Sequence, residues 1–286
     1  MKKIVLVFAL LITSFYVSAQ KLENTLLWEI SGNGLEQPSY LFGTIHITCD
    51  ATLSPKVIKA LDKTSQVVLE IDIDDPGMQM KMMQGMMMKG GKTLNDFVTD
   101  EEYQAIDSLF IKNMGMSVGM MKSVKPSLLQ ATLIPKLLDC SMQSVEGELV
   151  KVAKEQGEEI KGLETIEYQL SVFDAIPYED QVKELVRSAK DNLAFDKKTI
   201  ASMLEVYASE NITRMLTMMD EDEESIMNEH DDKMLDERNE NWIPEIGKYA
   251  KEKPTFFGVG AAHLAGDKGV IKLLRAAGYK VKPVMK

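Results

Sequence analysis

The sequence predicts an α/β fold of the mixed α+β kind, with a central β-sheet built from the two ends of the chain and a helical middle. Three observations lead to this prediction. Short runs rich in aromatic and β-branched residues occur near both ends, patterns typical of helices fill the interior, and one segment of the first part resembles one of the last. The 286 residues are 45% hydrophobic, which is enough for a full core.

The first 19 residues have the features of a signal peptide. Lys2 and Lys3 are followed by an apolar run over 4–11 and by small residues before the expected cleavage point. We therefore expect residues 20–286 to form one domain of a periplasmic or secreted protein. The apolar run is shorter than the roughly 20 residues that span a bilayer, so no stable membrane anchor is expected after cleavage.

The mature N-terminal part predicts a hairpin, a short helix and a third strand. The hairpin strands are expected over 25–30 and 39–46, with Ser-Gly-Asn-Gly as the turn between them. Ser54 and Pro55 provide an N-cap and a first helical residue. The third strand is expected over 66–73, QVVLEIDI.

Two helical regions follow, an insertion at about 76–157 and a segment at about 178–251. In the first, Thr99 and Glu102 form a capping box for a helix that stops near Gly115. The remaining expected elements are helices over 126–139 and 146–156, a strand over 159–163, and a closing strand, helix and strand over 255–259, 267–277 and 279–284.

The segment from Pro38 to His46 resembles the one from Pro254 to His263. Each has a proline, a hydroxyl residue, aromatic and apolar strand residues, and then Gly-x-x-His. Two half-sheets related by a pseudo-two-fold would place both motifs at equivalent strand ends.

His46 and His263 are therefore candidate metal ligands, since imidazole is the commonest metal-binding side chain near neutral pH. Glu70 is the best third ligand, because a carboxylate inside an apolar strand is costly to bury unless it is paired. The alternatives are two hydrogen-bonded core histidines and a glutamate that faces solvent from an edge strand.

Three further residues are candidates for supporting chemistry. Glu164 follows a short strand and could act as a general base, or it could lie in the first turn of a helix and favour its dipole. Arg238 could bind a substrate carboxylate or an oxyanion, with Asn239 beside it. Alternatively, Arg238 stacks on Trp242, four residues along the same helix face.

The other histidine and the methionines are less specific. His230 lies in a heavily polar segment and is expected on a solvated helix face. Seven of the 20 methionines fall within residues 78–88. This cluster could bind Cu(I), form an adaptable groove for peptides, or simply pack.

Cys49 and Cys140 are the only cysteines. An oxidising compartment permits a disulfide between them, and the alternative is two small buried hydrophobic side chains. The net charge of −11 argues against nucleic acid as a partner, because binding phosphates requires clustered lysine and arginine.

The two Gly-x-x-His motifs resemble those of the TraB/PrgY/GumN family, which includes the Tiki metalloproteases. The likeness extends to Leu27–Ile30, to Leu69-Glu70, to Gly162-Leu-Glu164 with Gln169, to Glu237-Arg-Asn239 with Trp242, and to Gly278-Tyr279. It implies an α/β fold like that of erythromycin-esterase-like and ChaN-like proteins. It also implies a peptidase that depends on a divalent metal, with His46, His263 and Glu70 as metal-site candidates and Glu164, Arg238 and Asn239 in support.

The leading hypothesis is thus an exported hydrolase, a peptidase that holds one divalent ion (Mn, Co or Zn) and acts on peptide or protein substrates. The second is a non-enzymatic peptide-binding or sequestering protein that uses the methionine-rich helices. A third is a family member that has kept the fold without the chemistry. The sequence leaves open whether the protein forms a homodimer.

Overall fold

The computed structural model describes residues 22–218, 221 and 226–286, so the predicted signal peptide lies outside the described residues. The mixed α/β prediction is confirmed. One six-stranded sheet has the order β4-β3-β5-β2-β1-β6. Its strands are β1 (Leu27–Ser31), β2 (Ser39–Thr44), β3 (Gln66–Ile71), β4 (Glu159–Glu164), β5 (Phe256–Gly260) and β6 (Lys280–Pro283).

The sheet is parallel on one side and antiparallel on the other. Strands β4, β3, β5 and β2 run parallel, while β1 pairs antiparallel with both β2 and β6. The predicted hairpin is β1–β2. The two similar segments lie side by side, since Thr44 of β2 is in register with Gly260 of β5. A pseudo-two-fold is compatible with this central pair but does not extend outward, because β3 runs parallel to β5 whereas β1 runs antiparallel to β2.

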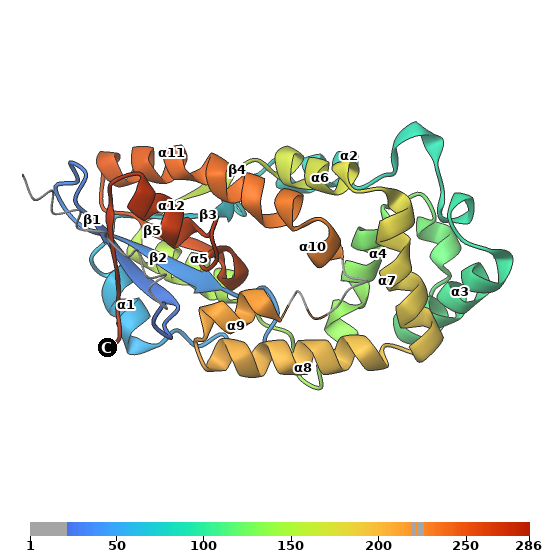
Figure 1. Ribbon diagram of the computed structural model, residues 1–286. Coiled ribbons are helices and arrows are strands. Elements are labelled where there is room, and N and C mark those ends of the chain that lie inside the picture. The colour runs from blue at the N-terminus through green and yellow to red at the C-terminus, as the bar shows by residue number, and fades with distance from the viewer. Residues whose placement is uncertain (1–21, 219–220, 222–225) are drawn as a thin grey trace, which may run out of the picture.

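Helices cover both faces of the sheet and extend well beyond it (Figure 1). Helices α1 and α5 lie on one face, α11 and α12 on the other, and α3, α4 and α7 form the opposite end of the molecule. The bounds are α1 (Pro55–Leu61), α2 (Met78–Gly85), α3 (Asp100–Met114), α4 (Pro126–Leu133), α5 (Val145–Gln156), α6 (Ile166–Ala175), α7 (Tyr178–Asp191), α8 (Ala194–Ala208), α9 (Ile212–Thr217), α10 (Ile226–Glu229), α11 (Glu237–Glu252) and α12 (Val270–Ala276).

Local signals placed several helix ends correctly. The Thr99–Glu102 capping box forms at the start of α3, and Gly115 ends that helix in the left-handed conformation. The helix expected over 126–139 is shorter, because α4 ends at Leu133 and a 3₁₀ turn follows (η4, Ile134–Lys136). Pro135 has no N–H with which to continue the α-helical hydrogen bonds.

Two separate hydrophobic clusters stabilise the molecule. The larger surrounds the sheet and includes Trp28, Trp242, Phe256 and Phe257. The smaller lies between α3, α4 and α7; its buried members include Ile106, Phe110, Leu129, Leu133 and Leu185. The molecule is therefore a sheet region joined to a helical region, each with its own core.

Cys49 and Cys140 form a disulfide, with their Cα atoms 5.7 Å apart and a sequence separation of 91. The disulfide reading of the two cysteines is therefore confirmed. Among the described residues, no helix is long and apolar enough to cross a membrane.

Candidate functional site

Two acidic side chains meet at the carboxyl ends of neighbouring parallel strands. Ile71 of β3 is in register with Glu164 of β4, and Glu70 precedes Ile71. Ligand sites in open α/β sheets occur at this edge. Both carboxylates are buried, so each needs a compensating partner.

Arg238 of α11 is that partner. Its Nη2 lies 2.5 Å from Glu70 Oε2 and 2.7 Å from Glu164 Oε1, and its Nε lies 3.1 Å and 3.2 Å from the two oxygens of Glu164. Its Nη1 donates to the carbonyl oxygen of Met234 at 3.1 Å. The guanidinium also stacks on Trp242, 4.8 Å from the ring centroid. The predicted stacking of Arg238 on Trp242 is therefore present, and its other contacts are with the protein's own carboxylates. Binding of a substrate carboxylate or an oxyanion by Arg238 stays a prediction.

The buried face of helix α11 contributes polar side chains to the site. Arg238 and Trp242 share that face, as their spacing predicts. Trp242 Nε1 donates to Glu164 Oε2 at 2.9 Å. A π-helical turn (η6, Asp232–Asp236) leads directly into α11, and such turns are frequent at functional sites.

His263 is buried against the same group, at the end of the 3₁₀ turn (η7, Ala261–His263) that follows β5. Its Nδ1 lies 2.6 Å from Asn239 Oδ1, and its Nε2 lies 3.3 Å from Arg238 Nη1. Arginine can only donate, so Nε2 accepts and the Nδ1 proton is donated to Asn239. The Asn239 amide nitrogen in turn donates to the carbonyl of Lys268 at 3.0 Å, which fixes its orientation. Burial lowers the pKa of His263 to about 3, so the ring is neutral.

Glu70 is held from three sides. Besides Arg238, it accepts the Gly260 N–H at 2.8 Å and the Gln169 side-chain amide at 3.2 Å. Burial alone would raise its pKa, but Arg238 and its other neighbours outweigh burial and lower the pKa to about 2. Burial raises the pKa of Glu164 instead. The two carboxyl groups therefore differ in proton affinity although both contact one guanidinium.

Gly260 allows this close approach. A β-carbon there would lie 3.2 Å from Glu70 Oε1, tighter than an ordinary contact, so a larger residue would push against the carboxylate at the strand end. The glycine of the second Gly-x-x-His motif therefore leaves space for the carboxylate. It does not adopt a backbone angle that favours glycine.

His46 follows β2 and is mostly exposed, with 65% of its side chain accessible. Its Nδ1 lies 2.8 Å from Glu146 Oε1 of α5, and this carboxylate raises the pKa of His46 to about 9. His46 and Glu70 line one cavity of about 300 Å³, together with Gln169 and Glu146. Glu146 was missed from the sequence, where it is one of many helical glutamates and nothing local marks it.

The structure thus brings Glu70, Glu164, Arg238, Asn239 and His263 into one hydrogen-bonded group, with His46 across a shared cavity. His263 Nε2 lies 3.8 Å from Glu70 Oε1. Among the described residues, the ligand atoms of a different set, Asp180, Glu229 and His230, all lie within 4.8 Å of one another. The assignment of His46, Glu70 and His263 as a metal site stays a prediction.

Asp180, Glu229 and His230 could also hold a metal ion, and they join α7 to α10. His230 Nε2 lies 3.2 Å from Asp180 Oδ2, so this histidine is not on a solvated helix face as expected. Helix packing brings His230 against α7, and the sequence pattern does not show this packing. Lys183 pairs with both carboxylates of the set and partly neutralises them.

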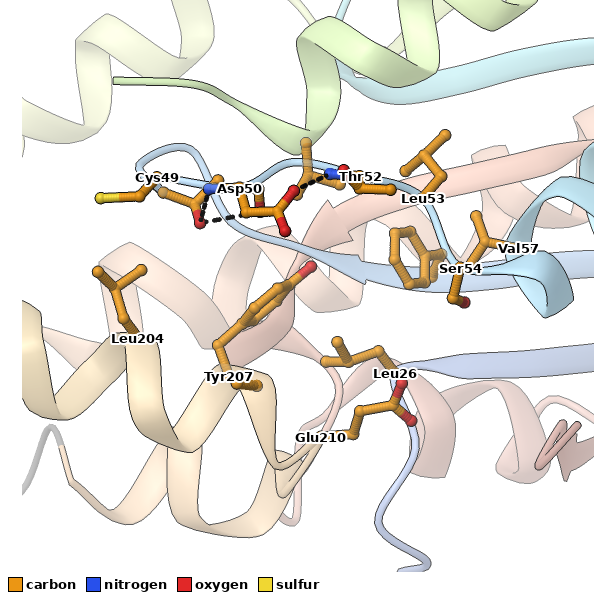
Figure 2. A pocket seen from close by; sticks show the side chains of 14 residues that line it. Leu26, Cys49, Asp50, Thr52, Leu53, Ser54, Val57, Leu204, Tyr207 and Glu210 are labelled. Carbon is orange, nitrogen blue, oxygen red and sulfur yellow. Dashed lines mark hydrogen bonds between the residues drawn. The ribbon is translucent and has the colours of Figure 1, made fainter. Parts of the chain in front are cut away.

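A further cavity of about 350 Å³ lies near the end of β2, between Tyr207 of α8 and Cys49 (Figure 2). None of the predicted site residues lines it. Several methionines are exposed elsewhere, above all Met80, Met83 and Met120, at 66%, 62% and 79%.

The comparisons with known proteins give one match. No curated protein and no solved structure matches the chain. The family model of the TraB/PrgY/gumN family matches residues 26–283, which include all six strands and every residue of the site. The chain therefore belongs to the TraB/PrgY/gumN family.

Proposed function

We propose that this protein is an exported, divalent-metal-dependent hydrolase that cleaves peptide or protein substrates. The observation that carries the proposal is the state of His263. Its ring is buried and neutral, its Nδ1 proton is donated to Asn239, and its Nε2 lies 3.8 Å from Glu70. A second partner that fixes the tautomer in this way is characteristic of a metal-binding histidine.

The residue types of the predicted set suit a catalytic ion, although among the described residues their ligand atoms do not all lie within 4.8 Å of one another. His46, His263 and Glu70 would provide two nitrogens and one oxygen, the ligand set of many catalytic sites. Both histidines use Nδ1 for a partner, Glu146 or Asn239, so Nε2 is the nitrogen that would bind an ion. At His263 the ion would have to replace the hydrogen bond that Nε2 accepts from Arg238 Nη1. When bound, a divalent ion such as Mn, Co or Zn would polarise a carbonyl and lower the pKa of water. His46 must lose its proton to bind, so uptake of the ion should release protons.

The protein's own residues would then perform three tasks. Glu164, whose pKa is raised by burial, would accept a proton as the general base. Gln169 donates toward both Glu70 and Glu164 and so fixes their relative orientation. Arg238 would stabilise developing negative charge, although the present contacts occupy its N–H groups, so one must be exchanged during the reaction.

A second candidate function rests on a different observation. The exposed methionines of α2 and the adjoining turns form adaptable apolar surface, which favours peptide binding without cleavage. In that case a peptide would be recovered intact, and replacing Met80, Met83 and Met87 by glutamine would abolish binding while His46→Ala would not.

The test measures metal content and peptide cleavage on the same preparations. We expect wild type to bind about one ion and to cleave members of a peptide library, and His263→Ala and His46→Ala to lose both properties. His230→Ala is the matched control, because it removes a histidine of the other candidate set. If His263→Ala and His46→Ala retain metal and cleavage while His230→Ala loses them, the proposed site is wrong.

A further inference from the structure

The loop that carries His46 is held by a segment almost a hundred positions away in the chain. Thr48 and Gln143 exchange backbone hydrogen bonds of 3.0 Å and 2.8 Å, and the N–H of Val145 donates to the carbonyl of Ile45 at 3.2 Å. The Gln143 side chain also accepts the N–H of Ala51 at 3.0 Å. These bonds fix residues 143–145 alongside the His46 loop.

Covalent and side-chain contacts strengthen this attachment. The Cys49–Cys140 disulfide joins the two segments just beyond the backbone bonds. From the other side, the Tyr207 hydroxyl donates to the carbonyl of Gly43 at 3.0 Å, and Figure 2 shows its ring pointing from α8 toward β2. The first Gly-x-x-His motif is thus restrained at its glycine and beyond its histidine.

The same segment delivers Glu146 to His46. Ser144 caps α5 by accepting the Gly147 N–H, and its hydroxyl lies 2.9 Å from Glu146 Oε2. Glu146 Oε1 lies 2.8 Å from His46 Nδ1. The glutamate side chain is only 11% exposed, against 65% for the histidine. A buried carboxylate therefore contacts one nitrogen of a ring that is otherwise largely exposed.

We infer that Glu146 is a positioning residue that holds His46 by Nδ1 and leaves Nε2 for the ion, with residues 140–146 as its support. The inference deepens the proposed function and rests on it. An exposed histidine without such a partner would sample several rotamers, and ordering it would weaken ion binding. Asn239 has the corresponding position beside His263, so each predicted metal-binding histidine has its own anchor.

The experiment measures Mn²⁺ affinity by electron paramagnetic resonance on the full chain with its disulfide intact. We expect Glu146→Ala to weaken binding about 10- to 100-fold, the usual effect of losing such a partner. Glu146→Gln should weaken binding less, because the amide oxygen can still accept the Nδ1 proton. Glu148→Ala is the matched control, since Glu148 lies on the same helix, is partly exposed and pairs only with Lys151 among the side-chain contacts described. It should bind like wild type.

The outcomes separate this inference from the proposed function. If His46→Ala weakens Mn²⁺ binding and the folded Glu146 variants do not, Glu146 has no positioning function and the proposed site stands. If neither His46→Ala nor His263→Ala weakens binding, the site itself is wrong and the inference fails with it. Circular dichroism and thermal unfolding of each variant show whether Glu146→Ala folds, and Glu146→Gln provides the answer if it does not.

Discussion

Arg238 is the residue on which the buried polar group depends most. It is itself buried and contacts Glu70 and Glu164, two carboxylates that are almost completely buried. Replacing it by methionine keeps much of its volume but leaves both acids without their cation. Removing one partner of a buried ion pair costs far more than the pair contributes, because the remaining charge stays desolvated.

We therefore expect Arg238→Met to lower the free energy of unfolding by about 3–5 kcal/mol at pH 7, measured by urea denaturation. The matched control is Arg214→Met, since the Arg214 side chain is partly exposed and its surface pair with Glu221 should contribute little to stability. Equal effects of the two substitutions would contradict the structural importance of the buried pair.

Asn239 gives a second prediction at this scale. Asn239→Leu removes the acceptor of the His263 Nδ1 proton, so the ring loses its fixed tautomer. We expect Mn²⁺ affinity to fall about 10- to 100-fold, measured by titration of the apoprotein. Asn241→Leu, two residues along the same helix, is the control, because its amide contacts the Tyr168 hydroxyl away from His263. Unchanged affinity in Asn239→Leu would argue against His263 as a ligand.

Residue patterns showed much of this site but not all of it. Glu70 stood out because it interrupts an apolar strand, and His263 because its motif repeats that of His46. Arg238 and Trp242 stood out by their helical spacing. Glu146 could not be predicted, because its importance comes from the packing of α5 against the His46 loop and local sequence does not encode that packing.

Among the elements, those with strong local signals agree best with prediction. The hairpin, the helix ends at Thr99, Gly115 and Gly157, and the closing strand–helix–strand all follow from turn and capping residues. Strand order could not be predicted in this way, since it depends on contacts between distant segments. The similar sequences of the two Gly-x-x-His segments suggested equivalent strand ends, but not that β2 and β5 would pair side by side.

The disulfide joins the loop that carries His46 to residues 140–146. The bridge closes a loop of about 90 residues that contains β3 and α1–α4, so reduction should increase the entropy of the unfolded chain considerably. We expect reduction, or the Cys49→Ser/Cys140→Ser double variant, to lower the unfolding free energy by up to about 4–5 kcal/mol.

The measurement is urea unfolding with and without reductant. The double variant in oxidising buffer serves as the control for effects of the reductant itself. A change below about 1 kcal/mol would mean that the backbone bonds of Thr48 and Gln143 suffice to hold the pair.

At the scale of the whole molecule, Lys125 connects the sheet region to the helical region. It precedes α4, is fully buried, and contacts Asp174 at 2.9 Å and the carbonyl of Leu170 at 2.9 Å, both on α6. Helix α6 also carries Gln169, which contacts the site carboxylates. One buried ammonium group thus fixes the helical core relative to the helix that supports the candidate site.

Lys125→Met should destabilise the protein by about 2–3 kcal/mol at pH 7, below the full cost of breaking a buried pair, because Asp174 is partly exposed and keeps Lys89 as a partner. The loss should depend on pH. Burial would raise the pKa of Asp174, but Lys125 and Lys89 outweigh it and hold that pKa below its ordinary value of 3.8. The stabilisation is therefore present above pH 3.8 and disappears as the pH falls through the lowered pKa. Urea unfolding of wild type and variant should accordingly differ most at pH 7 and converge as the pH falls below 3.8, whereas a difference that stays constant with pH would show that Lys125 acts through packing alone.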